Sequence, residues 1–84
     1  MSPLVLLSKP GCHLCEVMKA VVLPVLADLG LSLEERDVRA TPEGLARYAR
    51  EIPVLLCGME VVASGRTTAE AVRTRLLELS SAPS

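Results

Sequence analysis

The chain has 84 residues, half of them apolar, and a formal net charge of −1. This length fits one domain near the lower limit for folding without a disulfide, a metal or a partner. A nearly neutral chain with Tyr48 as its single aromatic residue offers neither a basic surface nor stacking side chains, so we expect no nucleic-acid partner. The domain is expected to span residues 1–79, with 80–84 as a frayed tail, and to be a monomer.

The first apolar run extends only from Leu4 to Leu7, which is too short for a secretion signal or a membrane span. Three cysteines, an odd number, disfavour a secreted disulfide scaffold. In a reducing compartment a close cysteine pair is more often catalytic or metal-binding than structural. We therefore expect a cytoplasmic protein with no membrane contact, whose cysteines have a chemical role.

The pattern of apolar residues predicts alternating strands and helices along the chain. In chain order these are strand 3–8, helix 12–29, strand 31–38, helix 41–52, strands 53–57 and 60–63, and helix 67–79. In the strand 31–38, Leu33 and Val38 are expected to face inward and Asp37 outward. A parallel crossover between the first two strands and an antiparallel hairpin at the end predict an α/β protein, with three helices packed on a four-stranded mixed sheet.

Local signals mark the ends of several predicted elements. Pro24 predicts a kink or a loosened last turn in the first helix, and Gly30 is placed to end that helix. Gly58 suits the tight turn between the last two strands. Thr67 and Glu70 form a capping box, which predicts the start of the last helix.

Cys12 and Cys15 stand at the predicted start of the first helix, directly after the first strand. Helical spacing puts their sulfur atoms about one turn apart, within disulfide reach. Free backbone donors and the helix dipole favour a thiolate at the helix start. We therefore expect Cys12 to be the nucleophile, and Cys15, which is less exposed, to be the resolving thiol.

Charged neighbours are expected to tune the reactive thiol. Lys9, three residues before Cys12, adds a positive charge that favours the thiolate, and protonated His13 has the same effect. Glu16 opposes it. Together these charges predict that the thiolate of Cys12 is moderately favoured over the thiol. The alternative role for His13 is that of a solvent-facing spacer.

A metal site is the alternative for the cysteine pair. Zinc needs a second ligand pair, and no further CxxC or HxxxH follows. Haem attachment needs histidine directly after Cys15, where Glu16 stands. An iron–sulfur cluster shared between two chains stays open, as does an interaction module with idle thiols. We assign no metal ligand and no tightly bound cofactor, and we expect Cys57 to be a buried small apolar residue.

Three segments of the chain carry a family resemblance. Ser8-Lys9-Pro10-Gly11-Cys12-His13-Leu14-Cys15 is similar to the Ser-Lys-x-x-Cys-Pro-Tyr-Cys segment of glutaredoxins, which have the thioredoxin fold. Glu51-Ile52-Pro53 falls where the family has Thr-Val-Pro, and Ser64-Gly65 falls where it has Gly-Gly. The likeness covers nearly the whole chain, which most resembles the short bacterial glutaredoxin-like proteins.

The resemblance implies a thiol–disulfide oxidoreductase. The thiolate of Cys12 would attack a small-molecule or protein disulfide, and Cys15 would resolve the mixed disulfide. A cis peptide bond before Pro53 would place the backbone of Ile52 to pair with an extended substrate, with Gly65 also at the substrate site. A thiol would serve as the reductant, and glutathione is a candidate co-substrate.

The chain also departs from the family pattern at the positions that usually contact glutathione. His13 and Leu14 replace the Pro-Tyr pair between the cysteines, and Glu51 adds a negative charge. Thr67 or Thr68 stands where an acidic residue usually holds the glutathione amine. The sequence therefore favours thiol exchange and leaves the identity of the substrate open.

Overall fold

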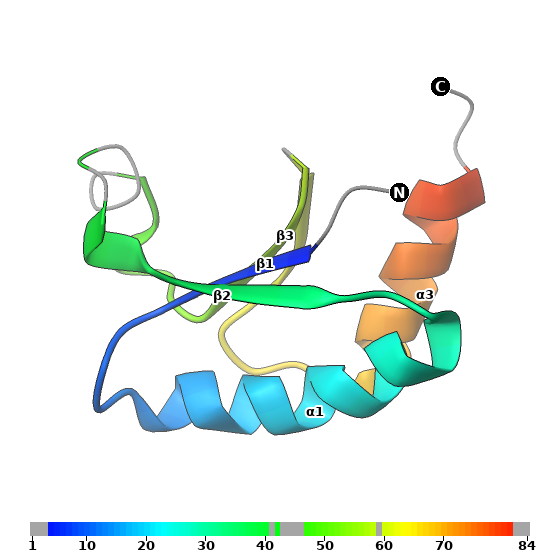
Figure 1. Cartoon of the computed structure of the whole chain (residues 1–84), viewed down its shortest axis with the longest axis horizontal. Coiled ribbons are helices and arrows are strands. Elements are labelled where there is room, and N and C mark those ends of the chain that lie inside the picture. The colour runs from blue at the N-terminus through cyan, green and yellow to red at the C-terminus, as the bar shows by residue number, and fades with distance from the viewer. Residues whose placement is uncertain (1–3, 41, 43–46, 59, 82–84) are drawn as a thin grey trace.

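The structure, a computed structural model, describes residues 4–40, 42, 47–58 and 60–81 of the chain. Its sheet contains four strands in the order β2-β1-β3-β4. The strands are β1 (Leu4–Ser8), β2 (Leu33–Asp37), β3 (Val54–Cys57) and β4 (Glu60–Ser64). The helices are α1 (His13–Leu29), the short 3-10 helix η1 (Val38–Ala40) and α3 (Ala69–Ser81), arranged as in Figure 1.

The sheet has the mixed topology that the sequence predicts. β1 pairs in parallel with β2 and antiparallel with β3, and β3 and β4 form an antiparallel hairpin. The hairpin turn contains Gly58, whose φ of 61° lies in the left-handed region that glycine adopts without steric strain. The predicted four-stranded mixed sheet is therefore confirmed.

Within the described residues the number of α-helices is smaller than predicted. The described residues form two α-helices, α1 and α3, where three are predicted. The middle helix is predicted over 41–52, and residues 41 and 43–46 of that segment lie outside the described residues. Neither of the two described α-helices is long and apolar enough to cross a membrane.

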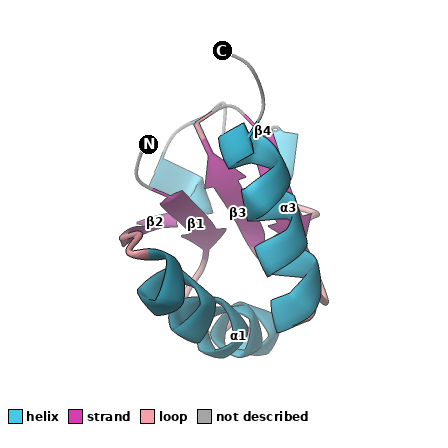
Figure 2. Ribbon diagram, turned by 90° about the vertical axis from the view of Figure 1, so that its right-hand side faces the viewer, coloured by secondary structure: helices cyan, strands magenta, loops and turns pink. Residues whose placement is uncertain are grey.

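The hydrophobic core lies between the sheet and the two α-helices. α1 runs along the sheet in Figure 1, and Figure 2 shows α3 beside β3 and β4. The core cluster consists of Leu4, Leu6, Met18, Val22, Val25, Leu26, Leu55, Val62, Val72 and Leu76. Because no aromatic residue belongs to this cluster, many small aliphatic contacts must supply the packing energy.

α1 continues through Pro24 as one unbroken helix. Pro24 is exposed, and so is Ala20, whose carbonyl would accept the missing proline N–H in a regular helix. Water can therefore satisfy that carbonyl. This placement explains how the helix tolerates the proline.

Gly30 ends α1, as predicted. Its φ of 69° is left-handed, its N–H donates to the carbonyl of Ala27 at 3.3 Å, and the N–H of Leu31 donates to the carbonyl of Leu26 at 2.9 Å. This pair of bonds is a Schellman motif, which satisfies two of the free carbonyls at the helix end.

β2 is shorter and more polar than predicted. It ends at Asp37, and Val38 is buried in η1 rather than in the strand. Asp37 is half-buried and lies on the same side of the sheet as Leu33, opposite to the predicted outward orientation. β2 is the terminal strand of the sheet. A polar side chain at its end can therefore lie on the helix-covered face without entering the hydrophobic core.

α3 begins one residue later than the capping box predicts. Oγ1 of Thr68, not Thr67, accepts the N–H of Ala71 at 3.1 Å. Val72 and Leu76 of this helix are buried, whereas Ala69 is exposed. The helix also continues to Ser81, into the segment predicted as a frayed tail.

Replacing Thr68 with alanine is expected to lower the free energy of unfolding by about 1 kcal/mol, because the N–H of Ala71 loses its capping partner. Urea unfolding followed by far-UV circular dichroism measures this change. Thr67→Ala is the matched control and should stay within about 0.5 kcal/mol of the wild type. Equal losses in the two variants would argue against Thr68 as the cap.

Candidate active site

The register of the sheet brings several loops to one end of the molecule. Ser8 and Asp37, the last residues of β1 and β2, pair with each other, and Val54, the first residue of β3, pairs with Ser64, the last of β4. The end of β1 also lies opposite the start of β3. The CxxC turn, the proline before β3 and the glycine after β4 therefore lie at the same end of the sheet.

Cys12 is the N-cap residue of α1 and forms a disulfide with Cys15, with their Cα atoms 5.3 Å apart. Sγ of Cys12 accepts the backbone N–H of Cys15 at 3.2 Å. The sulfur thus lies at the positive end of the helix dipole, where negative charge is stabilised. In the reduced protein the same donor and dipole favour the thiolate of Cys12.

The two cysteines differ in their access to solvent. Cys15 is 3% exposed, whereas Cys12 is only half-buried at the start of the helix. Cys12 is therefore the more accessible of the two sulfurs.

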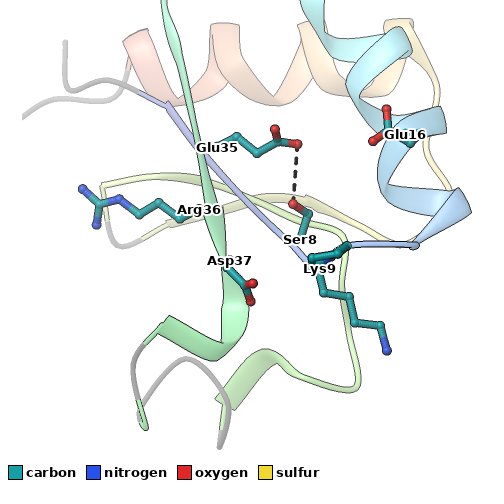
Figure 3. Close-up of a pocket in the computed structure, with 7 residues that line it drawn as sticks. Ser8, Lys9, Glu16, Glu35, Arg36 and Asp37 are labelled. Carbon is teal, nitrogen blue, oxygen red and sulfur yellow. Dashed lines mark hydrogen bonds between the residues drawn. The ribbon is translucent and has the colours of Figure 1, made fainter.

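Lys9 and His13 are both exposed next to Cys12. The carbonyl of Lys9 accepts the N–H of Cys12 at 3.3 Å, which closes the turn before α1. In Figure 3 the Lys9 side chain extends away from the sheet. Within the described part of the chain neither residue forms an ion pair, so their charges are not neutralised by a carboxylate.

The peptide bond between Ile52 and Pro53 is cis. Pro53 is buried and Ile52 is half-buried. The carbonyl of Pro53 accepts the N–H of Gly65 at 2.9 Å, so the segments before β3 and after β4 are held together. Gly65 in turn lines a small hollow with Leu14, one of the two residues between Cys12 and Cys15.

A cavity of about 290 Å³ lies on the β2 side of the CxxC turn. Figure 3 shows its charged lining residues, which include Glu16 from α1, and Glu35 and Asp37 from β2. Oε2 of Glu35 accepts the hydroxyl of Ser8 at 3.5 Å, and its Oε1 contacts Nζ of Lys19 at 3.4 Å. The sequence does not predict this cavity. Its shape depends on which residues of β1 and β2 pair with each other, and the pattern of apolar residues does not determine that register.

Asp37 stays ionised well into the acid range. Arg39 donates to its carboxylate through Nη2 at 2.7 Å and through its backbone N–H at 2.8 Å. The side-chain hydrogen bonds of Arg39, and then its backbone hydrogen bond, lower the pKa of Asp37 from 3.8 to about 2. The β2 side of the CxxC turn therefore keeps this negative charge at every pH at which thiols exchange.

Within the described residues no group of three or more histidine, cysteine or acidic side chains is placed to hold a metal ion. Cys57 is a free thiol at the far end of β3, and it is half-buried rather than buried as predicted. It pairs in the sheet with Leu4, at the opposite end of β1 from the CxxC turn.

The family model described as Glutaredoxin-like domain (DUF836) matches residues 3–77. A structural-genomics target protein from X. campestris is similar over 95% of this chain and 99% of its own, with 22% identity and a TM-score of 0.66. Thioredoxin 1 from Thermosipho africanus is similar over 93% of this chain and 97% of its own, with 19% identity and a TM-score of 0.59.

A glutaredoxin from Brucella melitensis is 28% identical to this chain, with a TM-score of 0.53, and the match covers 93% of this chain and 82% of that protein. No curated protein sequence matches the chain. The structural matches show an α/β thioredoxin-like fold. From the family match over nearly all its length, the chain belongs to the glutaredoxin-like domain family.

Proposed function

We propose that the protein is a thiol–disulfide oxidoreductase in which Cys12 is the nucleophile and Cys15 the resolving thiol. The observation that carries this proposal is the position of Cys12 as the cap of α1, bonded to Cys15 and accepting a backbone N–H. A sulfur held in this way is favoured as a thiolate. The buried position of Cys15 suits a thiol that meets only the sulfur of Cys12.

Reduction of a substrate takes two exchange steps. The thiolate of Cys12 attacks one substrate sulfur, so a Cys12–substrate bond forms and the other substrate sulfur leaves as a thiolate. Cys15 then loses its proton and attacks Cys12, which forms the Cys12–Cys15 bond and releases the second substrate thiolate. The substrate gains two electrons and, from water, two protons. An external thiol reductant returns the cysteine pair to its reduced form.

Other residues at this end of the sheet have supporting roles in the proposal. Lys9 and protonated His13 add positive charge near the thiolate. The backbone of Ile52 pairs with an extended substrate beside the cis bond to Pro53, and Gly65 completes that surface. The protein would act as a monomer in the cytoplasm, on a small-molecule or protein disulfide.

Titration against glutathione redox buffers of known potential tests the proposal. The Cys12–Cys15 pair is expected to have a midpoint of roughly −200 to −230 mV, the range of glutaredoxins. In the reduced protein, brief treatment with iodoacetamide followed by mass spectrometry should label Cys12 well before Cys15. Equal and slow labelling of both cysteines, at the rate of an ordinary thiol, would contradict the proposal.

A further inference from the structure

The two sides of the CxxC turn differ in chemistry. On the β2 side, the lining of the larger cavity contains charges of both signs, the carboxylates of Glu16, Glu35 and Asp37 and the basic side chains of Lys9 and Arg36. On the α3 side, a smaller hollow lies between α1 and the loop that joins β4 to α3, and its lining contains no acidic residue. Of the two hollows, only the one on the β2 side therefore has carboxylates in its lining.

The hollow on the α3 side, which we call the α3-side groove, has an apolar wall on α1 and a more polar wall on the loop after β4. It is lined by Leu14, Val17, Met18, Gly65, Arg66 and Thr67. Its volume is about 100 Å³, less than the roughly 150 Å³ of an engineered apolar cavity that accepts benzene. The groove therefore has room for one aliphatic side chain.

The walls of the α3-side groove belong to the site of the proposed reaction. Leu14 lies between the two cysteines in the sequence. Gly65 is bound through its N–H to the carbonyl of Pro53, which ties the outer wall to the segment proposed to pair with the substrate. A side chain in the groove would therefore belong to a residue close to the substrate cysteine.

Arg66 is exposed at the groove and forms no ion pair within the described part of the chain. Most other arginines of the described residues, by contrast, are paired with carboxylates: Arg36, Arg39, Arg73 and Arg75. The uncompensated guanidinium is complementary to a carboxylate on the partner.

We propose that the substrate is a polypeptide disulfide that places an aliphatic side chain in the α3-side groove and a neighbouring carboxylate against Arg66. This inference rests on the proposed function and specifies its substrate class. Glutathione has carboxylates but no aliphatic side chain, so it leaves the groove unfilled. A polypeptide with a leucine and an aspartate next to its cysteine meets both features.

Synthetic octapeptides, each oxidised to its symmetric disulfide dimer, test the proposal on the full chain. Two peptides carry leucine and aspartate next to the cysteine, one on its N-terminal side and the other on its C-terminal side. Two matched peptides carry glycine and lysine at the same positions. Glutathione disulfide and bis(2-hydroxyethyl) disulfide are the small probes. Single-turnover oxidation of the reduced protein is followed by acid quench, alkylation and mass spectrometry, since the chain has no tryptophan for a fluorescence signal.

The better leucine–aspartate peptide is expected to react about tenfold faster than its glycine–lysine counterpart and than glutathione disulfide, because it buries an aliphatic group and pairs a charge. Rates are normalised to bis(2-hydroxyethyl) disulfide, which tests the thiol chemistry without side-chain contacts. In Arg66→Glu the preference for the acidic peptide is expected to fall about fivefold, and in Val17→Phe the advantage of leucine over glycine is expected to be lost.

Matched controls separate these effects from general ones. Leu23→Phe changes an exposed apolar residue of the same helix, 44% exposed against 42% for Val17, outside the groove. Arg75→Glu makes the same charge change on α3. Both controls should keep the wild-type preference. A wild type without preference, or equal changes in variants and controls, overturns the inference while the proposed function stands, whereas no reaction with any probe overturns both.

Discussion

A Cys15→Ser variant is expected to hold its disulfide substrate as a stable mixed disulfide on Cys12. Cys12 keeps its position as the cap of α1, so its thiolate still attacks the substrate. The serine hydroxyl cannot complete the second exchange, since it is not ionised at neutral pH and forms no bond to sulfur. The covalent adduct should therefore accumulate, and intact-mass spectrometry of the protein under non-reducing conditions detects it.

A Cys12→Ser variant is expected to lose exchange by on the order of 10³-fold or more, because the remaining Cys15 is 3% exposed and no activated thiolate meets the substrate. Cys57→Ser is the control, since Cys57 is a free thiol at the far end of β3, and it should keep the wild-type rate. An adduct that forms on Cys15 or Cys57 instead of Cys12 would contradict the assigned order of attack.

A Leu6→Ala variant is expected to lose about 3 kcal/mol of unfolding free energy through lost burial and the cavity that remains. Leu6 is fully buried on β1, between β2 and β3, where it pairs with Glu35 and Leu55. A chain of 84 residues is expected to have a total stability of roughly 4–13 kcal/mol. This single change is therefore expected to remove a large share of it.

Urea unfolding by far-UV circular dichroism measures the loss, which corresponds to a midpoint shift of about 3 M at a slope of about 1 kcal/mol/M. Leu23→Ala is the control, because Leu23 is 44% exposed on α1. Leucine and alanine both favour helices, so the change should not disturb the helix itself. It should change stability by less than about 0.5 kcal/mol. A similar loss in both variants would mean that the core packing around Leu6 is not the cause.

The sequence predicts strands well where an apolar run is bounded by turn residues. β1 and β3 are each predicted within one residue, because their leucines and valines are buried or half-buried and Pro10 and Pro53 mark their limits. β2 is predicted less well. Most of its residues are charged and at least partly exposed, so the hydrophobic pattern gives little indication of where the strand ends or which side faces the helices.

The candidate site is predictable in its chemistry and less so in its surroundings. The spacing of Cys12 and Cys15 and their position after a strand indicate the helix cap that the structure contains. The cavity at Glu35 depends on which residues pair across β1 and β2. The helix cap is also undetermined by the sequence, because Thr67 and Thr68 both have the hydroxyl that a capping residue needs. Tertiary packing decides such details.

The charged character of β2 has a consequence for the behaviour of the protein in concentrated solution. A terminal strand exposes backbone donors and acceptors to which a strand of another molecule can add. Here the run Glu34-Glu35-Arg36-Asp37 occupies that position, and a second copy added in parallel and in register would place like charges opposite each other. The edge nearest the β2-side cavity thus protects the protein against sheet extension and aggregation.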